Sequence, residues 1–314
     1  MHRKDGTIKG LLWAEWAMLA YVVFTLVLMV WRWPELVSPM PMLWGRAGAV
    51  AMTLVLWRVY RRWPSPWTLL LRVVGQMALL AWWYPDTYEL NRCLPNLDHH
   101  FAAAEQALFG CQPALVFCQQ WPQTVVSELL SLGYVSYYPL IALVAIYYFF
   151  RRHDRFPHAV YVIMASFFLF YVIFDLLPVA GPQFYFEAVG TDLIAQGHFP
   201  DLGLYFRDHQ ACLDSPGWKD GPFYQLLVQA HNAGERPTAA FPSSHVGITT
   251  VLLWLAWASR CRPLFWTVVP FAVLMFFATV YIYAHYAVDA IAGLFVGTVF
   301  YFLLAATDRS KRRR

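Results

Sequence analysis

The stretch AFPSSHVGITT (residues 240–250) places a proline, two serines and a histidine immediately before a run of mostly hydrophobic residues. A second apolar run ends in YIYAHYAVDAIAG (281–293), so that His285 and Asp289 stand at the start of the next hydrophobic segment. Two apolar segments therefore each begin with a histidine. The composition of the rest of the chain decides what kind of segments these are.

The composition is that of a membrane protein. Of the 314 residues, 59% are hydrophobic and only 13% are charged, about half the charged fraction of an ordinary soluble domain. Apolar runs recur at about 17–25 residues, the length that crosses a bilayer as a helix. Eight such runs are predicted as spans: 10–31, 42–60, 66–84, 125–150, 157–178, 241–259, 263–284 and 286–307. We therefore expect an all-α fold, a polytopic transmembrane helical bundle.

Basic residues gather at alternate ends of these spans. Sixteen of the 23 Lys and Arg fall at five predicted inner ends: Arg3, Lys4 and Lys9; Arg58, Arg61 and Arg62; Arg151, Arg152 and Arg155; Arg260 and Arg262; Arg309, Lys311 and Arg312 to Arg314. Because short loops rich in Lys and Arg stay on the cytoplasmic side, we expect both termini inside. The net charge of +4 is mostly this orientation signal, and no single basic patch indicates a nucleic-acid partner.

This topology leaves two long segments outside, roughly 85–124 and 179–240. Within the first, residues 93–113 mix polar and apolar residues at helical spacing, which predicts an amphipathic helix lying on the outer leaflet. The outer segments hold four of the five cysteines: Cys93, Cys111, Cys118 and Cys212. Four outer cysteines suit either two disulfides in an oxidising compartment or free thiols near the membrane surface.

Both histidine motifs then fall on the outer face, and short connections make their helices neighbours. His285 and Asp289 are four residues apart and so share one helical face. Asp289 is expected to accept a hydrogen bond from one ring nitrogen of His285, which fixes the tautomer and frees the other nitrogen as a nucleophile. Ser243 or Ser244 is predicted to cap the helix, whose free amides form an anion site. His245 in that turn is a candidate general acid.

Each piece also has a structural interpretation. A lone histidine at a helix start is commonly an interfacial polar residue, and a His–x3–Asp pair is often a structural hydrogen bond. Asp175, near the outer end of its span, is a candidate for binding a substrate hydroxyl or a cation, or a structural carboxylate. The combination of two motifs on one membrane face and on neighbouring helices favours a functional site, since ionisable residues inside membrane spans are functional candidates.

FPSSH followed by HYAVD resembles the second and third motifs of the type-2 phosphatidic acid phosphatase superfamily. The resemblance implies a six-helix-type catalytic core over about residues 125–307 and divides the chain into N-terminal helices with the outer segment (1–124) and the core (125–314). It implies a metal-independent mechanism in which His285 forms a phosphohistidine, Asp289 orients it and His245 protonates the leaving group. Ser243 and Ser244 would hold phosphate oxygens.

Two departures from the superfamily pattern bear on the substrate. The first motif expects Lys, six residues, then Arg-Pro, but this chain has Gln229 before Arg236 and Pro237. The Ser-Arg expected before the third motif is replaced by Ala278 and Thr279. Thr279 and the surrounding aromatic residues are similar to the inositol phosphorylceramide synthase branch. Phosphate-binding cations are thus unassigned, and the nearest outer candidates are Lys219, Arg236 and Arg207.

We therefore expect an integral membrane enzyme, in a bacterial inner membrane, with its active site on the periplasmic face. Its partners are a phospholipid or lipid phosphate and the membrane lipids, and no cofactor, metal ion or obligate protein partner is expected. If water accepts the phosphate group the enzyme is a lipid phosphatase; if a lipid hydroxyl accepts it, the enzyme is a phosphotransferase resembling inositol phosphorylceramide synthase. A transporter is the remaining alternative.

Overall fold

The computed structural model describes residue 8 and residues 10–307, which include fourteen α-helices and two short 3-10 helices. In chain order, the elements up to the middle of the chain are α1 (Trp13–Trp31), η1 (Trp33–Glu35), α2 (Pro39–Arg62), α3 (Pro66–Asn91), α4 (Asp98–Phe109), α5 (Pro113–Gln120), α6 (Thr124–Val135), α7 (Tyr137–Arg151) and α8 (Phe156–Leu176). They are followed by α9 (Pro182–Val189), α10 (Thr191–Ala195), η2 (Tyr205–Arg207), α11 (Pro222–Gly234), α12 (Ser244–Ala258), α13 (Arg262–Tyr281) and α14 (Ala287–Ala305).

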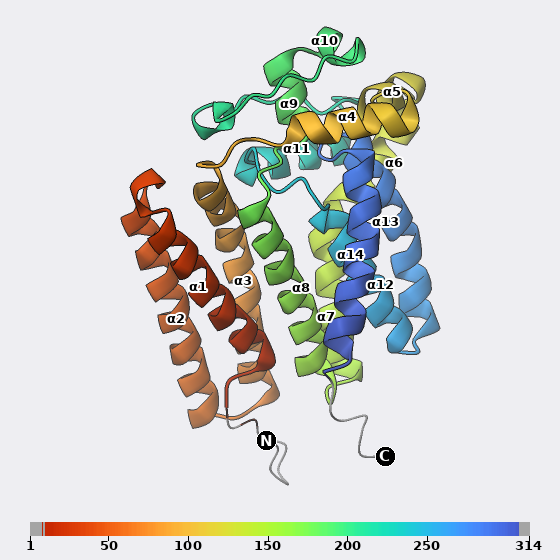
Figure 1. Cartoon of the computed structure of the whole chain (residues 1–314). Helices are drawn as coiled ribbons and strands as arrows, with labels where there is room; N and C mark the ends of the chain where they lie inside the picture. The colour runs from red at the N-terminus through yellow and green to blue at the C-terminus, as the bar shows by residue number, and fades with distance from the viewer. Residues whose placement is uncertain (1–7, 9, 308–314) are drawn as a thin grey trace.

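The long helices stand side by side in two groups joined by α8 (Figure 1). Helices α1, α2 and α3 form one group, and α6, α7, α12, α13 and α14 form the other, while α8 packs against members of both. Helix α4 lies across one end of the second group, with α9 and α10 beyond it. The start of α1 and the end of α14 lie together at the opposite end.

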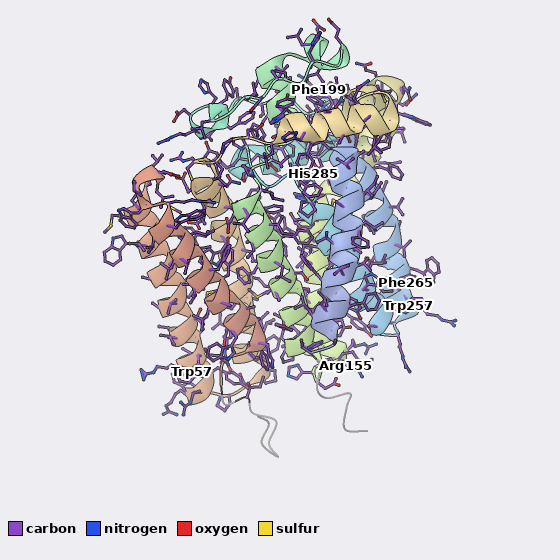
Figure 2. The ribbon with its side chains drawn as sticks, viewed as in Figure 1. Trp57, Arg155, Phe199, Trp257, Phe265 and His285 are labelled. Atoms are coloured by element: carbon purple, nitrogen blue, oxygen red, sulfur yellow. The ribbon has the colours of Figure 1, made fainter. Side chains whose placement is uncertain are left out.

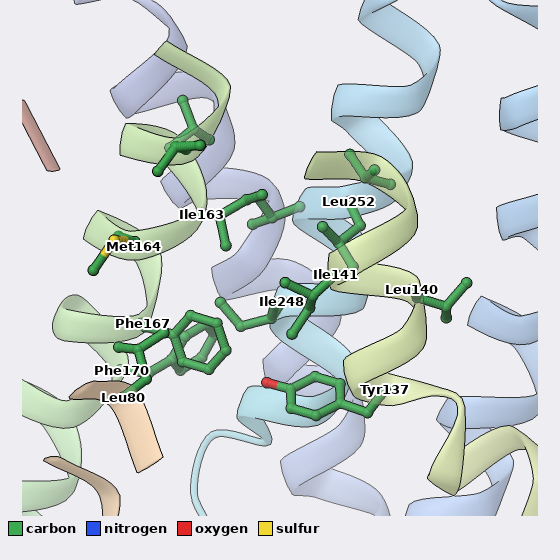
Figure 3. Packing of buried hydrophobic residues seen from close by; sticks show 14 of the residues in the cluster. Leu80, Tyr137, Leu140, Ile141, Ile163, Met164, Phe167, Phe170, Ile248 and Leu252 are labelled. Carbon is green, nitrogen blue, oxygen red and sulfur yellow. The ribbon is translucent and has the colours of Figure 1, made fainter. Parts of the chain in front are cut away.

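Helix α8 is the centre of the bundle. In the most apolar 18-residue stretch of α8, 72% is buried inside the protein. The buried share of the corresponding stretches of α1, α13 and α14 is only 33–44%. Part of the packing around it is seen in Figure 3, where side chains of α7, α8 and α12 meet: Tyr137, Leu140, Ile141, Ile163, Met164, Phe167, Phe170, Ile248 and Leu252. Because lipid tails are as apolar as these side chains, close van der Waals packing stabilises the helix contacts.

The predicted all-helical membrane bundle is confirmed, and each predicted span overlaps a helix or a bent helix pair. Among the described residues, four helices are long and apolar enough to cross a bilayer: α1, α8, α13 and α14. The number rises to six if the bent pairs α4–α5 and α6–α7 each count as one span. Helix α12 has only 15 residues, so the count of eight stays a prediction. The predicted inner residues Arg3, Lys4, Lys9, Arg309, Lys311 and Arg312–Arg314 lie outside the described residues.

Helices α12 and α14 approach each other closely because glycines line their contact. A Cβ atom added to Gly293 would collide with the Ser243 carbonyl oxygen, and one added to Gly297 would collide with the Gly247 carbonyl oxygen. Small residues are the usual means by which membrane helices bring their backbones together. This close approach holds the start of α12, and with it His245, against the start of α14.

Polar side chains are paired within the apolar interior. Arg46 of α2 forms a two-point ion pair with Asp86 of α3, and Arg72 of α3 pairs with Glu15 of α1. All five cysteines are free, which agrees with the second of the two alternatives for the outer thiols. Cys118, for example, lies with its Sγ 3.0 Å from the hydroxyl oxygen of Tyr283.

Candidate active site

The site begins at the first turn of α12, which contains the serines and the histidine of the opening motif. Ser243 is the N-cap, and its hydroxyl oxygen accepts a hydrogen bond from the Val246 amide at 3.3 Å, the interaction expected of a serine N-cap. The Ser243 amide donates to the backbone carbonyl oxygen of Asp289 at 3.0 Å. The preceding Phe241–Pro242 peptide bond is cis. The side-chain bond thus caps α12, and the backbone bond to Asp289 fixes the start of α12 against the start of α14.

His285 lies in the short loop between α13 and α14, at the end of the bundle that α4 crosses (Figure 2). Its Nδ1 lies 2.8 Å from the Ala240 carbonyl oxygen, so Nδ1 carries a proton and donates it. Its Nε2 lies 3.4 Å from Nδ1 of His245. The fold thus brings the two predicted histidines together and leaves Nε2 of His285 as the nitrogen with a lone pair.

Asp289 is placed differently from the arrangement that its spacing predicts. Its Oδ2 is 3.8 Å from Nδ1 of His285, which is too far for a hydrogen bond. Oδ2 instead accepts from the Tyr286 amide at 2.9 Å, while Oδ1 is buried without a hydrogen-bond partner in the described chain. Tyr286 is the N-cap of α14 and Asp289 its third residue, so helix capping competes for this carboxylate. The Ala240 carbonyl, not Asp289, fixes the tautomer of His285.

Burial lowers the pKa of His285 to about 4, because the charged imidazolium loses its hydration. The hydrogen bond to Ala240 and the charge of Glu235 act in the opposite direction but are weaker. The residue is only 4% exposed. At neutral pH the ring is therefore uncharged with a free lone pair on Nε2, which is the state that a histidine nucleophile requires.

Two tyrosines at the bend between α6 and α7 enclose His245. The ring of Tyr134 is stacked on that of His245 with 4.8 Å between centroids, and the ring of Tyr137 lies 4.5 Å away at a tilt. The Tyr137 hydroxyl reaches the Ser244 carbonyl oxygen at 3.5 Å. These tyrosines precede the histidine motif by about a hundred residues, and neither forms part of a motif. They hold the imidazole of His245 facing His285.

A narrow cavity lies against both histidine rings. Its lining includes Tyr84, Tyr134, Glu235, Ser244, His245 and His285. The Glu235 carboxylate accepts hydrogen bonds from the hydroxyls of Tyr84 at 3.3 Å and Tyr134 at 3.2 Å. None of the described residues that line the cavity is a lysine or an arginine. The site therefore combines two histidines with one carboxylate and lacks a cationic side chain in its wall.

The basic residues predicted as phosphate-binding candidates lie outside this lining. Arg236 is half-buried, and its Nη1 donates to the backbone carbonyl oxygen of Glu235 at 3.0 Å. Lys219 is exposed, with its Nζ 3.1 Å from Oδ2 of Asp214. Arg207 is half-buried in η2. The structure brings none of these three cations to the wall of the histidine cavity.

Asp175 is also separate from the cavity. It is fully buried near the end of α8, where its Oδ2 accepts from the Tyr21 hydroxyl of α1 at 2.9 Å. Its backbone carbonyl oxygen lies 3.3 Å from Nη1 of Arg32, which donates to it. These contacts join α8 to the N-terminal helices. Of the alternatives weighed for Asp175, they favour the structural carboxylate.

Two buried carboxylates of α4, which the motifs do not single out, hold the loop that carries His285. Asp98 accepts from the Gly181 amide at 2.8 Å and from the Tyr286 hydroxyl at 3.0 Å. Glu105 accepts from the Ala287 amide at 2.5 Å, in the first turn of α14. The two acids are seven residues apart and therefore share one helical face. That spacing in the predicted amphipathic segment is the signal that would have found them.

A protein-family model described as PAP2 superfamily matches residues 99–303. The chain is also similar to a solved structure, the crystal structure of the first transmembrane PAP2 type phosphatidylglycerolphosphate phosphatase from Bacillus subtilis, with 16% sequence identity and a TM-score of 0.38. That match covers 69% of this chain and 95% of the other. No curated protein matches the chain.

Proposed function

The chain belongs to the PAP2 superfamily, and from that premise we propose that it is a membrane enzyme that removes the phosphate group from a lipid phosphate. The observation that carries the proposal is the approach of two histidine nitrogens, Nε2 of His285 and Nδ1 of His245, to 3.4 Å beside one cavity. Once a phosphate group enters between them, two neighbouring imidazoles can act on it, one as nucleophile and the other as acid and base.

In the proposed first step, Nε2 of His285 attacks the phosphorus and the bond from phosphorus to the lipid oxygen breaks. Protonated His245 gives its proton to that oxygen, so the lipid leaves as an alcohol. In the second step His245 takes a proton from water, whose oxygen attacks the phosphohistidine. The phosphorus–nitrogen bond then breaks, which releases phosphate and restores His285.

The surrounding residues have positioning roles in this scheme. The Ala240 carbonyl holds the proton on Nδ1 of His285, which supports attack by Nε2. The first-turn amides of α12, with Ser243 and Ser244, are proposed to hold the phosphate oxygens, because a helix start attracts anions. Asp289 is proposed to act mainly through the cap of α14.

The charge of the cavity favours a second candidate function. A phosphate monoester carries up to two negative charges and is held best by arginine or lysine, yet the described lining contains Glu235 and neither of these. A phosphodiester carries one negative charge, and Glu235 can accept hydrogen bonds from head-group hydroxyls. Transfer of a phospho-head group to a lipid hydroxyl, as in inositol phosphorylceramide synthases, would use the same histidines.

The test is a product assay on the purified protein. Labelled phosphatidate, a prenyl diphosphate, and phosphatidylinositol with and without ceramide are supplied separately. Free phosphate without ceramide supports the phosphatase, and a ceramide-dependent phospholipid supports the transferase. His285→Ala should lower the rate by about a thousandfold or more, while His209→Ala, on an exposed histidine stacked on Tyr205, should not. Full activity of the His285 variant would refute the phosphohistidine mechanism.

Orientation and boundaries belong to the same proposal. We propose that the histidine cavity faces the periplasm and that both termini lie in the cytoplasm, on the strength of the basic clusters at the opposite ends of the spans. The catalytic core is proposed to lie within residues 125–314, behind the helices of residues 1–124. The matched range begins at residue 99, so it also includes α4 and α5, which pack over the site.

A further inference from the structure

A second cavity lies at the end of the bundle opposite the histidines. Figure 2 labels Arg155, Trp257 and Phe265 at that end and His285 at the other. The cavity has a volume of about 930 Å³ and lies between the α7–α8 and α12–α13 connections. Its size falls within the range of small-molecule and cofactor sites. It is therefore large enough for a lipid head group.

The wall of this cavity is strongly basic. Four arginines line it, namely Arg152, Arg155, Arg260 and Arg262, and no aspartate or glutamate is among the described lining residues. Guanidinium groups bind phosphate with paired, charge-assisted hydrogen bonds. The nearest acid on the same connection, Asp154, is exposed and 3.8 Å from Nε of Arg155. Such a pair is too weak and too exposed to cancel the charge of the wall.

The backbone around the cavity adds to this charge. Helix α13 begins at Arg262, and its N-cap, Cys261, makes no side-chain cap hydrogen bond. The start of a helix carries a partial positive charge. At the end of α12, where carbonyl oxygens would oppose an anion, Nη1 of Arg152 donates to the Ser259 carbonyl oxygen at 3.0 Å. That bond reduces the opposition and fixes Arg152 in the wall.

The rim of the cavity is aromatic and faces outward. Trp257 and Trp266 are 63% and 66% exposed, and Phe265 lies between them in the lining. Tryptophans at the ends of membrane helices lie at the level of the lipid head groups. An anionic pocket ligand with an apolar tail would therefore place its charge among the arginines and its tail along this rim.

We propose that this cavity binds the anionic head group of a phospholipid from the leaflet opposite the histidine cavity. The preference of arginines for the cytoplasmic ends of spans explains why arginines lie at this end of the bundle. That preference alone does not require them to line a cavity. Here four of them converge on one cavity with an aromatic rim, as in the basic pockets that hold anionic lipid head groups. The ligand chemistry is a phosphate attached to acyl chains, and its site is independent of the catalytic proposal.

The test measures lipid binding to the full-length purified protein in detergent by native mass spectrometry. The probes are dioleoylphosphatidylglycerol and dioleoylphosphatidylcholine at low salt. We expect specific binding of the phosphatidylglycerol, with its Kd weakened roughly tenfold or more in R260Q/R262Q, because each arginine near a membrane surface contributes appreciably to anionic-lipid binding. Thermal unfolding without lipid should match that of the unsubstituted protein.

The matched control is R61Q/R62Q, which removes two exposed arginines that lie over Trp57 and Trp63 but line no part of this cavity. An equal loss of binding in this control would show general charge attraction and overturn the proposal. So would equal binding of both lipids, or unchanged binding by R260Q/R262Q. A third arm adds inorganic phosphate: displacement of the lipid at equal concentration would identify a free-phosphate site and reject the lipid.

Discussion

At the scale of single residues, the geometry of His285 depends on backbone atoms. The Ala240 carbonyl oxygen is 2.8 Å from its Nδ1, whereas the nearest Asp289 oxygen is 3.8 Å away. Ala239 and Tyr283, adjacent to these segments, have left-handed backbone with φ of 66° and 69°. Such conformations cost about 1–3 kcal/mol in non-glycine residues and occur often at functional sites. Packing around the cavity therefore has to hold this backbone in place.

The role of Asp289 can be separated into capping and charge. Asp289→Asn keeps an oxygen that can accept from the Tyr286 amide, whereas Asp289→Ala removes the cap at a cost of about 1 kcal/mol. We expect the Asn variant to keep most of its kcat/KM and the Ala variant to lose stability and activity together. Both are measured by product assay and thermal unfolding. A loss of about 10⁴-fold in the Asn variant, as for a carboxylate that fixes a tautomer, would contradict the capping role.

The pKa of His285 predicts the pH dependence. Because burial lowers this pKa to about 4, the acid limb of kcat/KM should lie below about pH 5, for a substrate that does not titrate there, whereas the alkaline limb belongs to His245, which must be protonated to act as the acid. The charged or titratable groups around the ring are His245, Glu235 and Asp289. Glu235 raises the pKa of His285, so Glu235→Gln should move the acid limb to lower pH. An acid limb near 6.5, or a shift upward, would contradict this assignment.

The sequence predicted that His245 and His285 lie close together. Each histidine stands in a short recognisable motif, and the order of the apolar runs places both motifs at the same end of the bundle. Motif spacing misplaced the partner of His285, since a backbone carbonyl has no signature in the sequence. The cavity acid, Glu235, was equally hidden. It stands next to Arg236, the residue that the first motif singles out, yet its side chain and not that of Arg236 lines the cavity.

At the scale of helices, the span positions were predictable because a long apolar run suits only a helix in a bilayer. The bend of 48° between α6 and α7 was not predicted, because the run 125–150 was read as one span, although Gly133 and Pro139 lie on either side of the bend. The bend presents Tyr134 and Tyr137 to His245. The position of α4 across the site was also hidden, because it depends on contacts with residues far along the chain.

Helix α4 should act on the reaction through Glu105. Its carboxylate accepts from the Ala287 and Val288 amides, next to the His285 loop. Glu105→Ala leaves both amides without their acceptor and should lower kcat/KM about tenfold. Glu105→Gln keeps an acceptor oxygen and should restore most of the activity. The control is Glu187→Ala, on an exposed acid of α9 at the same end. Equal activity of the Ala and Gln variants would show that Glu105 does not position the loop.

At the scale of the whole molecule, the N-terminal helices contribute directly to the site although the matched range begins after them. The Tyr84 hydroxyl of α3 donates to Glu235 in the cavity at 3.3 Å. Asn91, at the end of the same helix, donates to Thr238 and to the Phe174 carbonyl oxygen. Buried ion pairs join helix α3 to α1 and α2. The stability of this N-terminal layer, helices α1 to α3, is therefore coupled to the shape of the histidine cavity.

The Arg46–Asp86 pair tests that coupling. Nη2 of Arg46 is 2.6 Å from Oδ2 of Asp86, both are nearly fully buried, and Asp86 is two residues beyond Tyr84. Asp86→Leu leaves an unpaired buried guanidinium, which should cost about 3–5 kcal/mol of stability and lower kcat/KM by displacing Tyr84.

Replacing both partners, as Arg46→Leu with Asp86→Leu, removes the buried charge and should recover most of that stability, since apolar side chains can substitute for a buried pair at little net cost. Thermal unfolding in detergent measures the change in stability, and the product assay measures the change in kcat/KM. Glu89→Leu is the control, because its pair with Arg92 is more exposed and should matter less. If the double variant is as unstable as Asp86→Leu, the lost stability comes from poor packing of the leucine side chains rather than from an unpaired charge. If it regains stability without activity, the pair itself positions Tyr84, and the N-terminal layer shapes the cavity through that contact.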